Sequence, residues 1–213
     1  MDKKLIKRLL DISYENQLHH LGSYFSCVET IDDIYSKMNQ DDIFILSNGH
    51  AAVALYVVLE KHFNFDAQDL LNEMGEHPHR NELKKVHCST GSLGMGITVA
   101  VGRALSNKDR DVYCMISDGE CSEGSVWESL KFIHENDINN LKIYVNANGW
   151  AAYDSIDIDY LEKRLKSFNP NINFIKTTVE QYGLTGLSAH YKNFTKEQYE
   201  EAVESLWEIH LLI

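Results

Sequence analysis

The 213-residue sequence is poor in proline, in cysteine and in positive charge, and it has no long uninterrupted apolar run. With only 2 prolines and 24% charged residues it does not have the composition of a disordered or low-complexity chain, so we expect it to fold. The 20 Lys and Arg residues are outnumbered by 32 Asp and Glu residues, which gives a net charge of −12. Because nucleic acids and anionic membranes attract clustered positive charge, this composition argues against both as partners.

The scarcity of cysteine and of long apolar stretches bears on the cellular compartment in which the protein is expected. The 4 cysteines are widely spaced and no two form a C-x-x-C pair, so we expect buried or incidental thiols rather than a disulfide or zinc framework. The longest stretches without a formal charge, 43–59 and 86–102, are interrupted by Asn, Gly, His, Ser and Thr, so neither is expected to span a membrane. The first ten residues mix charge into their apolar positions and lack the apolar core of a signal peptide. We therefore expect a cytoplasmic protein.

Helical and strand-like apolar patterns alternate along the chain. Apolar spacing predicts helices at about residues 3–17, 28–38, 51–62, 97–105, 123–136 and 195–208. Short apolar runs predict strands at 42–46, 111–116, 141–145 and 172–176. This alternation predicts an α/β fold with a parallel sheet and helices on both faces, and no linker divides it, so we expect one domain over 1–213. In such folds ligands bind beyond the carboxyl ends of the strands.

A carboxylate and an amide follow two consecutive predicted strands. Ser117-Asp118-Gly119-Glu120 comes directly after strand 111–116, and Asn146-Ala-Asn148-Gly149-Trp150 ends the next strand. Adjacent parallel strands would bring these turns together, and carboxylate, amide and backbone carbonyl oxygens suit a hard cation that bridges phosphate groups. For the first turn taken alone, a simple Asp-Gly turn is the alternative.

Small residues open the predicted helix at 97–105. The segment Thr90-Gly-Ser-Leu-Gly-Met-Gly96 would let a ligand approach backbone N–H groups at the positive end of the helix. Its spacing does not fit G-x-G-x-x-G, so it does not indicate a dinucleotide. Tight packing of the helix through small residues is the alternative.

Four histidines fall in stretches rich in Gly, Ser, Pro or polar residues, at His20, His50, His77 and His190. Brought together by the fold, they would donate hydrogen bonds to phosphate or sugar hydroxyl groups. The alternative is a transition-metal site formed by His77 and His79 with His87, although no acid or cysteine completes a regular ligand spacing.

Four ordered segments support a family assignment: His20-Leu-Gly-Ser23, Leu46-Ser-Asn-Gly-His50-Ala-Ala-Val-Ala-Leu-Tyr56, Thr90–Gly96, and Asp118-Gly-Glu-Cys-Ser-Glu-Gly-Ser-Val-Trp-Glu128. In order and spacing they resemble the N-terminal thiamine-diphosphate-binding domain of transketolases. The segment from Asp118 to Asn148 is similar to the cofactor motif of that superfamily, which begins Gly-Asp-Gly and ends with Asn. The resemblance covers about residues 10–154 and resumes near 174–177 and 190–192, and it implies the thiamine-diphosphate-binding α/β fold.

The resemblance also implies roles for individual residues. Mg²⁺ or Ca²⁺ would be ligated by Asp118, the Asn148 side chain and the Trp150 carbonyl. The implied cofactor-binding residues are His50, Gly91, Ser92, Leu93, Gly94, Gly119, Glu120, Asn148 and His190. The implied catalytic residues are His20, His50, His77, Glu123 and His190. Among them, His20 and His77 would face the substrate hydroxyls, and Glu123 would lie at a subunit boundary.

The implied reaction is the transfer of a two-carbon ketol unit from a ketose to an aldose, with sugars or sugar phosphates as substrates. In the family a second domain completes the active site, and no such domain is recognised in this sequence. The resemblance therefore implies a split transketolase, in which a separate C-terminal subunit completes the site, most simply in an α2β2 assembly.

Two departures from the family keep other interpretations open. Ser117 stands where the family has Gly, and only residues 155–171 join the metal-site loop to the last predicted strand, where the family has an additional strand and helix. We therefore expect a sheet that lacks one strand–helix unit. One alternative is a non-catalytic, transketolase-like scaffold or regulatory subunit, and another is a thiamine-dependent enzyme for an unusual sugar in surface-polysaccharide synthesis.

Overall fold

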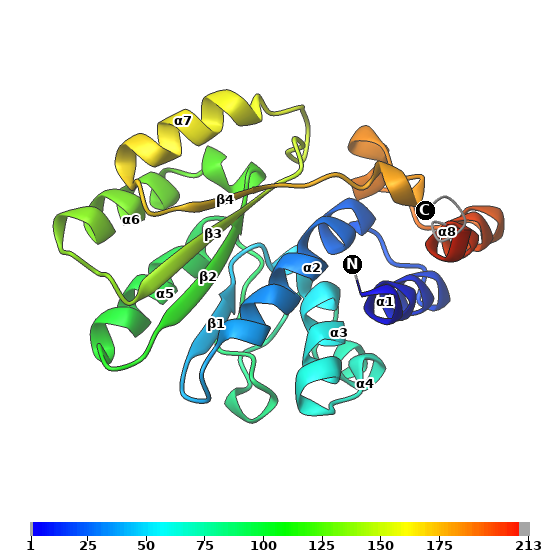
Figure 1. Ribbon diagram of the computed structural model, residues 1–213, viewed down its shortest axis with the longest axis horizontal. Coiled ribbons are helices and arrows are strands. Elements are labelled where there is room, and N and C mark those ends of the chain that lie inside the picture. Colours follow the sequence, from blue (N-terminus) through cyan, green and yellow to red (C-terminus); the bar gives the residue numbers. More distant parts are fainter. Residues whose placement is uncertain (1, 209–213) are drawn as a thin grey trace.

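The computed structural model describes residues 2–208 and is built on one parallel sheet (Figure 1). Its 4 strands lie in the order in which they occur along the chain: β1 (Ile43–Leu46), β2 (Val112–Ser117), β3 (Leu141–Ala147) and β4 (Asn173–Lys176). Every residue of β1 and β2 is buried, as expected for parallel strands that are covered on both faces. All strands predicted from the sequence are present, within a few residues of their predicted ends.

Helices cover both faces of this sheet, which confirms the predicted fold class. The α-helices of the described residues are α1 (Lys3–Glu15), α2 (Leu21–Lys37), α3 (Ala52–Phe63), α4 (Ala67–Met74), α5 (Met95–Ser106), α6 (Gly124–Glu135), α7 (Ile158–Phe168) and α8 (Lys196–Glu208). Helices α2 and α3 pack on one face, and α5, α6 and α7 on the other. None of these helices is long and apolar enough to cross a membrane.

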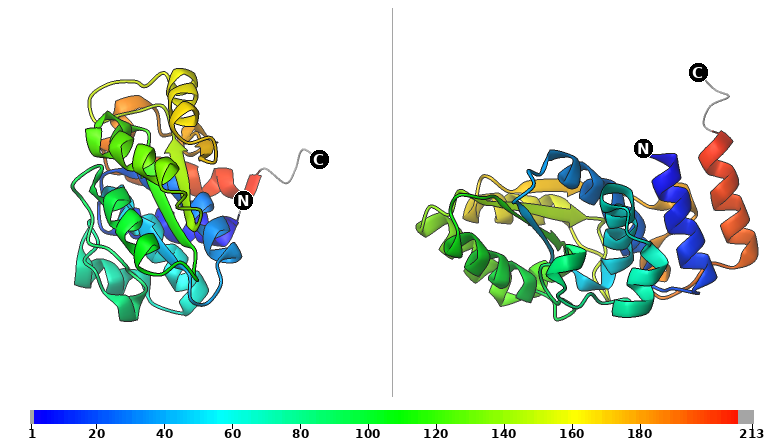
Figure 2. Two further views of the ribbon diagram at one scale, coloured as in Figure 1. Left: turned by 90° about the vertical axis from the view of Figure 1, so that its left-hand side faces the viewer. Right: turned by 90° about the horizontal axis from the view of Figure 1, so that it is seen from below.

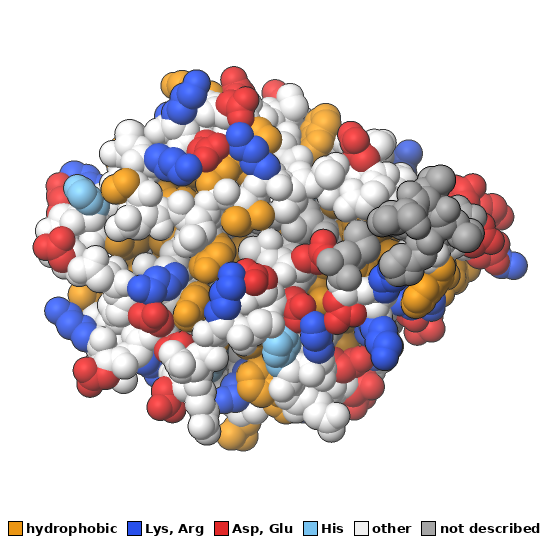
Figure 3. Space-filling model, in the orientation of Figure 1, with side chains coloured by type: hydrophobic (Ala, Val, Ile, Leu, Met, Phe, Trp, Pro, Cys, Tyr) orange, Lys and Arg blue, Asp and Glu red, His pale blue; other side chains and the backbone are white. Residues whose placement is uncertain are grey.

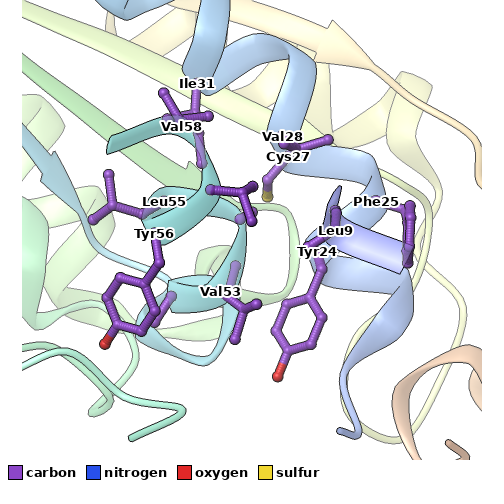
Figure 4. Close-up of a cluster of buried hydrophobic side chains, with 14 of the residues drawn as sticks. Leu9, Tyr24, Phe25, Cys27, Val28, Ile31, Val53, Leu55, Tyr56 and Val58 are labelled. Atoms are coloured by element: carbon purple, nitrogen blue, oxygen red, sulfur yellow. The ribbon is translucent and has the colours of Figure 1, made fainter. Parts of the chain in front are cut away.

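Alternate strand residues supply two hydrophobic clusters, one on each side of the sheet. In β1, Phe44 points into the cluster with α2 and α3, and its neighbour Ile45 into the cluster with α5 and α6. Side chains of α1, α2 and α3 meet in the first cluster (Figure 4), where Leu9 and Val58 are fully buried. Since each large apolar side chain buried in this way contributes about 1.5–3 kcal/mol, the sheet is held firmly from both sides.

Helix α8 begins with the predicted capping box and packs along α1. The Thr195 N–H donates to Gln198 Oε1 at 3.0 Å, and the Gln198 N–H donates to Thr195 Oγ1 at 3.2 Å. The rings of Tyr14 and Tyr199 stack with centroids 4.4 Å apart, and the right-hand view of Figure 2 shows the two helices side by side at one end of the molecule.

Two helices, α4 and α7, are not predicted from the sequence. Helix α7 buries only Leu161 and Leu165, one turn apart, in an otherwise polar segment, so its apolar signal is short. It occupies the connection between β3 and β4, and its first turn is capped by the Asp157 carboxylate, which accepts the Tyr160 N–H. Residues 2–208 form no fifth strand, but the helix that we expected to be missing from the 155–171 connection is present as α7.

The surface on the side shown in Figure 3 carries acidic and basic side chains that are interspersed. Lys and Arg do not gather into a patch on this face, which agrees with the absence of a nucleic-acid signal in the composition. Hydrophobic side chains reach the surface near its centre. A groove of about 380 Å³ lies beside α2, with Tyr144 and Ile175 of the sheet in its lining.

Candidate active site

A cavity of about 340 Å³ lies at the carboxyl ends of β1, β2 and β3, where an α/β fold binds its ligands. Most of the candidate residues identified in the sequence line it: His20, His50, His77, Gly91, Leu93, Asp118, Gly119, Glu123, Asn148, Trp150 and His190. They come from segments that are far apart in the sequence, so the fold itself brings them together.

Asp118 is a buried carboxylate at the end of β2, with only 2% of its surface exposed. Its Oδ1 accepts the Gly119 N–H at 2.9 Å, and its Oδ2 accepts the Gly149 N–H at 2.7 Å. The second hydrogen bond joins the turn after β2 to the turn after β3, as the sequence predicts. Burial raises the pKa of Asp118 to about 6, although these backbone donors oppose the shift. Within residues 2–208 this carboxylate forms no ion pair with Lys, Arg or His.

Asn148 presents its side chain beside Asp118 in the same cavity. Its Nδ2 donates to Ser26 Oγ at 3.3 Å, and its Oδ1 accepts the Trp150 N–H at 3.0 Å. Ser26 Oγ also accepts from Asn146 Nδ2 at 2.8 Å, which fixes the orientation of the Asn148 amide. The Trp150 carbonyl faces Gly119, where an added Cβ would lie 3.8 Å from the carbonyl oxygen.

This donor set fits a hard divalent cation. A carboxylate, an amide oxygen and a backbone carbonyl are the ligands that Mg²⁺ and Ca²⁺ prefer. A buried carboxylate without a positive partner is costly, and a bound cation would remove that cost. Asp118, Asn148 and Trp150 therefore suit the predicted metal.

Three histidine rings gather in the same cavity. The His20 ring centroid lies 5.3 Å from that of His50 and 6.3 Å from that of His77. His190 is joined to this group because its carbonyl accepts the His20 N–H at 3.3 Å, and its Nδ1 lies 3.3 Å from Ser23 Oγ. Burial lowers the pKa of His20 and of His190, and burial followed by repulsion from the other histidines lowers that of His50 to about 3. The rings of His20, His50 and His190 are therefore neutral near pH 7, so each carries both an N–H donor and a nitrogen acceptor.

The His50 shift predicts a dependence of stability on pH. The pKa of His50 falls from 6.5 to about 3 on folding. Between these two pH values His50 is therefore protonated in the unfolded chain but not in the folded chain. Stability is therefore lost as pH falls from about 6.5 towards 3, and by pH 5 the His50 share should be about 1–2 kcal/mol. Urea unfolding measures the free energy of unfolding at pH 7 and at pH 5. Between these pH values the His50→Asn variant should lose about 1–2 kcal/mol less stability than the wild type. Equal losses would show that His50 is protonated in the folded state.

The Gly-rich loop before α5 forms a further wall. Gly91 and Leu93 line the cavity, and an added Cβ at Gly91 would lie 3.0 Å from the His77 ring. Gly94 adopts a left-handed conformation with φ of 76°, and an added Cβ there would lie 2.7 Å from Glu123 Cβ. Glycine is therefore required where the loop turns against the Asp118 segment.

Three residues grouped with the cofactor site in the sequence do not line the cavity. Ser92 is exposed, Gly94 is buried behind the loop, and Glu120 is fully buried at 0% exposure. Glu120 is next to Gly119 in the sequence but does not share its position at the cavity. The turn after Asp118 forms the 3₁₀ helix η3 (Gly119–Ser122), which directs the Glu120 side chain into the protein.

The cavity also has lining residues that sequence reasoning does not identify: Ser23, Ser122, Ala151, Ala152, Tyr153 and Tyr191. Tyr153 is 90% exposed on the loop that follows Trp150, and the Tyr191 hydroxyl donates to the Ala152 carbonyl. Tyr191 and Ala152 are 39 residues apart in the sequence, so no local pattern predicts this contact. Ser23 has a signal, since it closes the His20-Leu-Gly-Ser23 motif.

The alternative transition-metal site is not supported. His87 Nδ1 lies 2.5 Å from Glu82 Oε2, and the other carboxylate oxygen of Glu82 contacts Arg80 and Arg103. Among residues 2–208 no group of three or more His, Cys, Asp or Glu side chains is arranged to hold a metal ion. All four cysteines are free thiols, as the sequence predicts.

Comparison with known proteins identifies the family. Residues 23–180 match the family described as the thiamine diphosphate binding domain of transketolase, and the chain belongs to that family. It is 28% identical to one of the subunits of the apulose-4-phosphate transketolase of Phocaeicola vulgatus, over 95% of this chain and 91% of that relative. It is 36% identical to transketolase-like protein 2 of Mus musculus over 62% of this chain, which is 23% of that protein.

Solved transketolases share the fold. The structure from Campylobacter jejuni matches 97% of this chain with a TM-score of 0.69 and 17% identity, and the match covers 43% of that chain. The Pichia stipitis enzyme in complex with sedoheptulose 7-phosphate matches 96% of this chain with a TM-score of 0.70 and 19% identity. This chain thus spans less than half of the solved transketolases but nearly all of the relative from Phocaeicola vulgatus.

Proposed function

We propose that the chain is the thiamine-diphosphate-binding subunit of a split transketolase, active only with a C-terminal partner. The observation that carries the proposal is a single cavity lined both by the buried Asp118 carboxylate, which forms no ion pair within residues 2–208, and by a cluster of four histidines. The length relation supports it, because the chain aligns along nearly all of the Phocaeicola vulgatus relative and along less than half of solved transketolases. The substrates proposed are a ketose donor and an aldose acceptor, as sugar phosphates or specialised sugars.

The proposed cofactors are thiamine diphosphate and Mg²⁺ or Ca²⁺. Asp118, the Asn148 amide oxygen and the Trp150 carbonyl would hold the cation. His50, Gly119 and His190 are proposed to contact the diphosphate, and Gly91 and Leu93 to flank the rings. When bound, thiamine diphosphate supplies the nucleophilic carbon and the electron sink for cleaving and forming carbon–carbon bonds.

The chain's own residues would bind and orient the sugar. His20 and His77 are proposed to face the substrate hydroxyls, where an imidazole can take part in hydrogen bonds and in proton transfer. The hydrogen bond between the His20 N–H and the His190 carbonyl holds the backbone of these two residues together. Glu123 lies at the mouth of the cavity, exposed, and is proposed to sit at the boundary with another subunit.

An apolar helix face beside Glu123 supports a partner. On α5, Met95 is 51% exposed and Val99 is 39% exposed, and Gly102 follows on the same side with no atom within 4 Å of its added Cβ. Small and apolar side chains next to a cavity mouth are suited to close packing against another chain. We propose that this face contacts the partner and that the complex is an α2β2 assembly.

Co-expression with a C-terminal transketolase subunit tests the proposal. We expect a stable complex on size-exclusion chromatography, with a mass that fits two copies of each chain. Met95→Asp should weaken the complex, whereas Leu83→Asp, at a site that is 90% exposed in the 3₁₀ helix η2 (Glu82–Lys84), should not. Failure of every C-terminal subunit of the same organism to associate would contradict the split-enzyme proposal.

A transketolase-like scaffold without turnover is the second candidate, and Ser117 is the observation that favours it. Ser117 lines the cavity where the family has glycine. Its hydroxyl oxygen accepts the Glu120 N–H at 3.2 Å, so the hydroxyl is used within the turn. A scaffold would bind no thiamine diphosphate in the assembled complex, and calorimetry with Mg²⁺ distinguishes the two candidates.

A further inference from the structure

Glu120 is the one residue of the Asp118 turn whose carboxylate is directed away from the cavity and into the protein. It is 0% exposed, and all the partners of its carboxylate are donors. Its Oε1 accepts the Ser47 hydroxyl at 2.7 Å and the Gly94 N–H at 2.8 Å, and its Oε2 accepts the Ser117 N–H at 3.0 Å. In each of these contacts a carboxylate oxygen of Glu120 is the acceptor.

These donors belong to three segments that each contribute other residues or themselves to the lining of the cavity. Ser47 follows β1, Ser117 ends β2, and Gly94 is the N-cap of α5 at the end of the Gly-rich loop. Their positions in the sequence differ by up to 70 residues, and Glu120 bonds to all three. The carboxylate therefore links the loop after β1, the turn after β2 and the start of α5.

The Gly-rich loop depends on this link. The Gly94 N–H is held by Glu120, and the Gly94 carbonyl accepts the Ser125 hydroxyl at 2.9 Å. Both backbone groups of Gly94 are thus bound to the segment that follows Asp118. Since Gly91 and Leu93 line the cavity just before it, the position of Gly94 sets how far that wall stands from Asp118.

We infer that Glu120 is a positioning residue that clamps the Gly-rich loop against the Asp118 turn, and so sets the width of the cofactor cavity without touching the cofactor. The inference deepens the proposed function and rests on it for the identity of the ligand. The clamp itself is a property of the chain without ligand, so it is tested separately.

Amide hydrogen exchange of Gly94 in the chain alone tests the clamp. Glu120→Ala removes both acceptor oxygens, so the Gly94 N–H loses its side-chain acceptor. We expect the Gly94 amide to exchange about tenfold faster, as for loss of a buried hydrogen bond. The Val112 amide, which donates to the Asn140 carbonyl at the far end of β2, should change little. Glu135→Ala, at an exposed glutamate of α6 that pairs with Lys131, is the matched control.

Two results would overturn the inference. One is a Gly94 amide as protected in Glu120→Ala as in Glu135→Ala. The other is equal acceleration at Gly94 and Val112, because Glu120 would then support global stability rather than the loop. If Glu120→Ala does not fold, Glu120→Asp keeps a carboxyl group but is one methylene too short to reach both Gly94 and Ser117, and faster exchange at Gly94 is again expected.

Cofactor affinity gives a second readout in the assembled complex. The dissociation constant for thiamine diphosphate with saturating Mg²⁺ should rise about tenfold in Glu120→Ala and stay within twofold of wild type in Glu135→Ala. Unchanged affinity in Glu120→Ala would contradict a role in setting the cavity. Absence of binding by the wild type would instead contradict the proposed function, while the Gly94 exchange would still decide on the clamp.

Discussion

Asp118→Ala is expected to abolish metal-dependent binding of thiamine diphosphate, with a loss of affinity of at least about 100-fold. Asp118 is the only carboxylate among the proposed metal ligands, and it is 2% exposed with no ion pair within the described residues. Its removal takes the charge from the cation site, whereas the amide of Asn148 and the carbonyl of Trp150 cannot hold a divalent cation alone. Calorimetry of the assembled complex, with and without Mg²⁺, measures the loss.

The matched control is Asp159→Ala, because Asp159 lies on α7 and pairs with Lys176 at the surface. This variant should bind as the wild type does. Asp118→Asn is the variant that should preserve the fold, because its amide oxygen still accepts one of the two backbone N–H groups that Asp118 accepts. Wild-type affinity in Asp118→Ala would remove Asp118 from the cofactor site.

Gly49→Ala is expected to destabilise the protein by about 3 kcal/mol. An added Cβ at Gly49 would lie 2.5 Å from the carbonyl carbon and oxygen of Thr90 and 2.7 Å from the Gly91 nitrogen. These are backbone atoms of the Gly-rich loop, so the clash cannot be relieved by a side-chain rotation. The free energy of unfolding in urea measures the effect.

Gly102→Ala is expected to change the stability of the chain in the opposite direction. Gly102 lies in α5 and an added Cβ there has no atom within 4 Å, so alanine should raise stability by about 0.5–1 kcal/mol through helix propensity. Equal stability of the Gly49 and Gly102 variants would show that the loop after β1 does not touch the Gly-rich loop.

The sheet is predictable because its strands are short, continuous apolar runs. Val112–Ser117 is buried at every position, and such a run followed by Ser-Asp-Gly predicts a strand with its turn. Helix α7 is not predicted because its two buried leucines, in a charged segment, give too weak an apolar periodicity to indicate a helix. Where a helix is fixed by contacts with the rest of the fold, local pattern carries little information.

The candidate site likewise contains residues that the sequence predicts and residues that it does not. Asp118 and Asn148 are found from sequence because each follows a strand, and parallel order places the ends of neighbouring strands together. The direction of Glu120 depends on the turn of η3 and on donors from Ser47 and Gly94, which are distant in the sequence. The same holds for Tyr153, whose place at the cavity results from the loop after Trp150.

The central claim is that this chain holds the cofactor-binding part of an active site that a second chain completes. The most direct measurement is ketol transfer between a ketose and an aldose by this chain alone, by the C-terminal partner alone and by their mixture, each with thiamine diphosphate and Mg²⁺. We predict activity in the mixture only, and its loss in Asp118→Ala. Ketol transfer by this chain alone, or by a mixture in which Asp118→Ala is fully active, would contradict the claim.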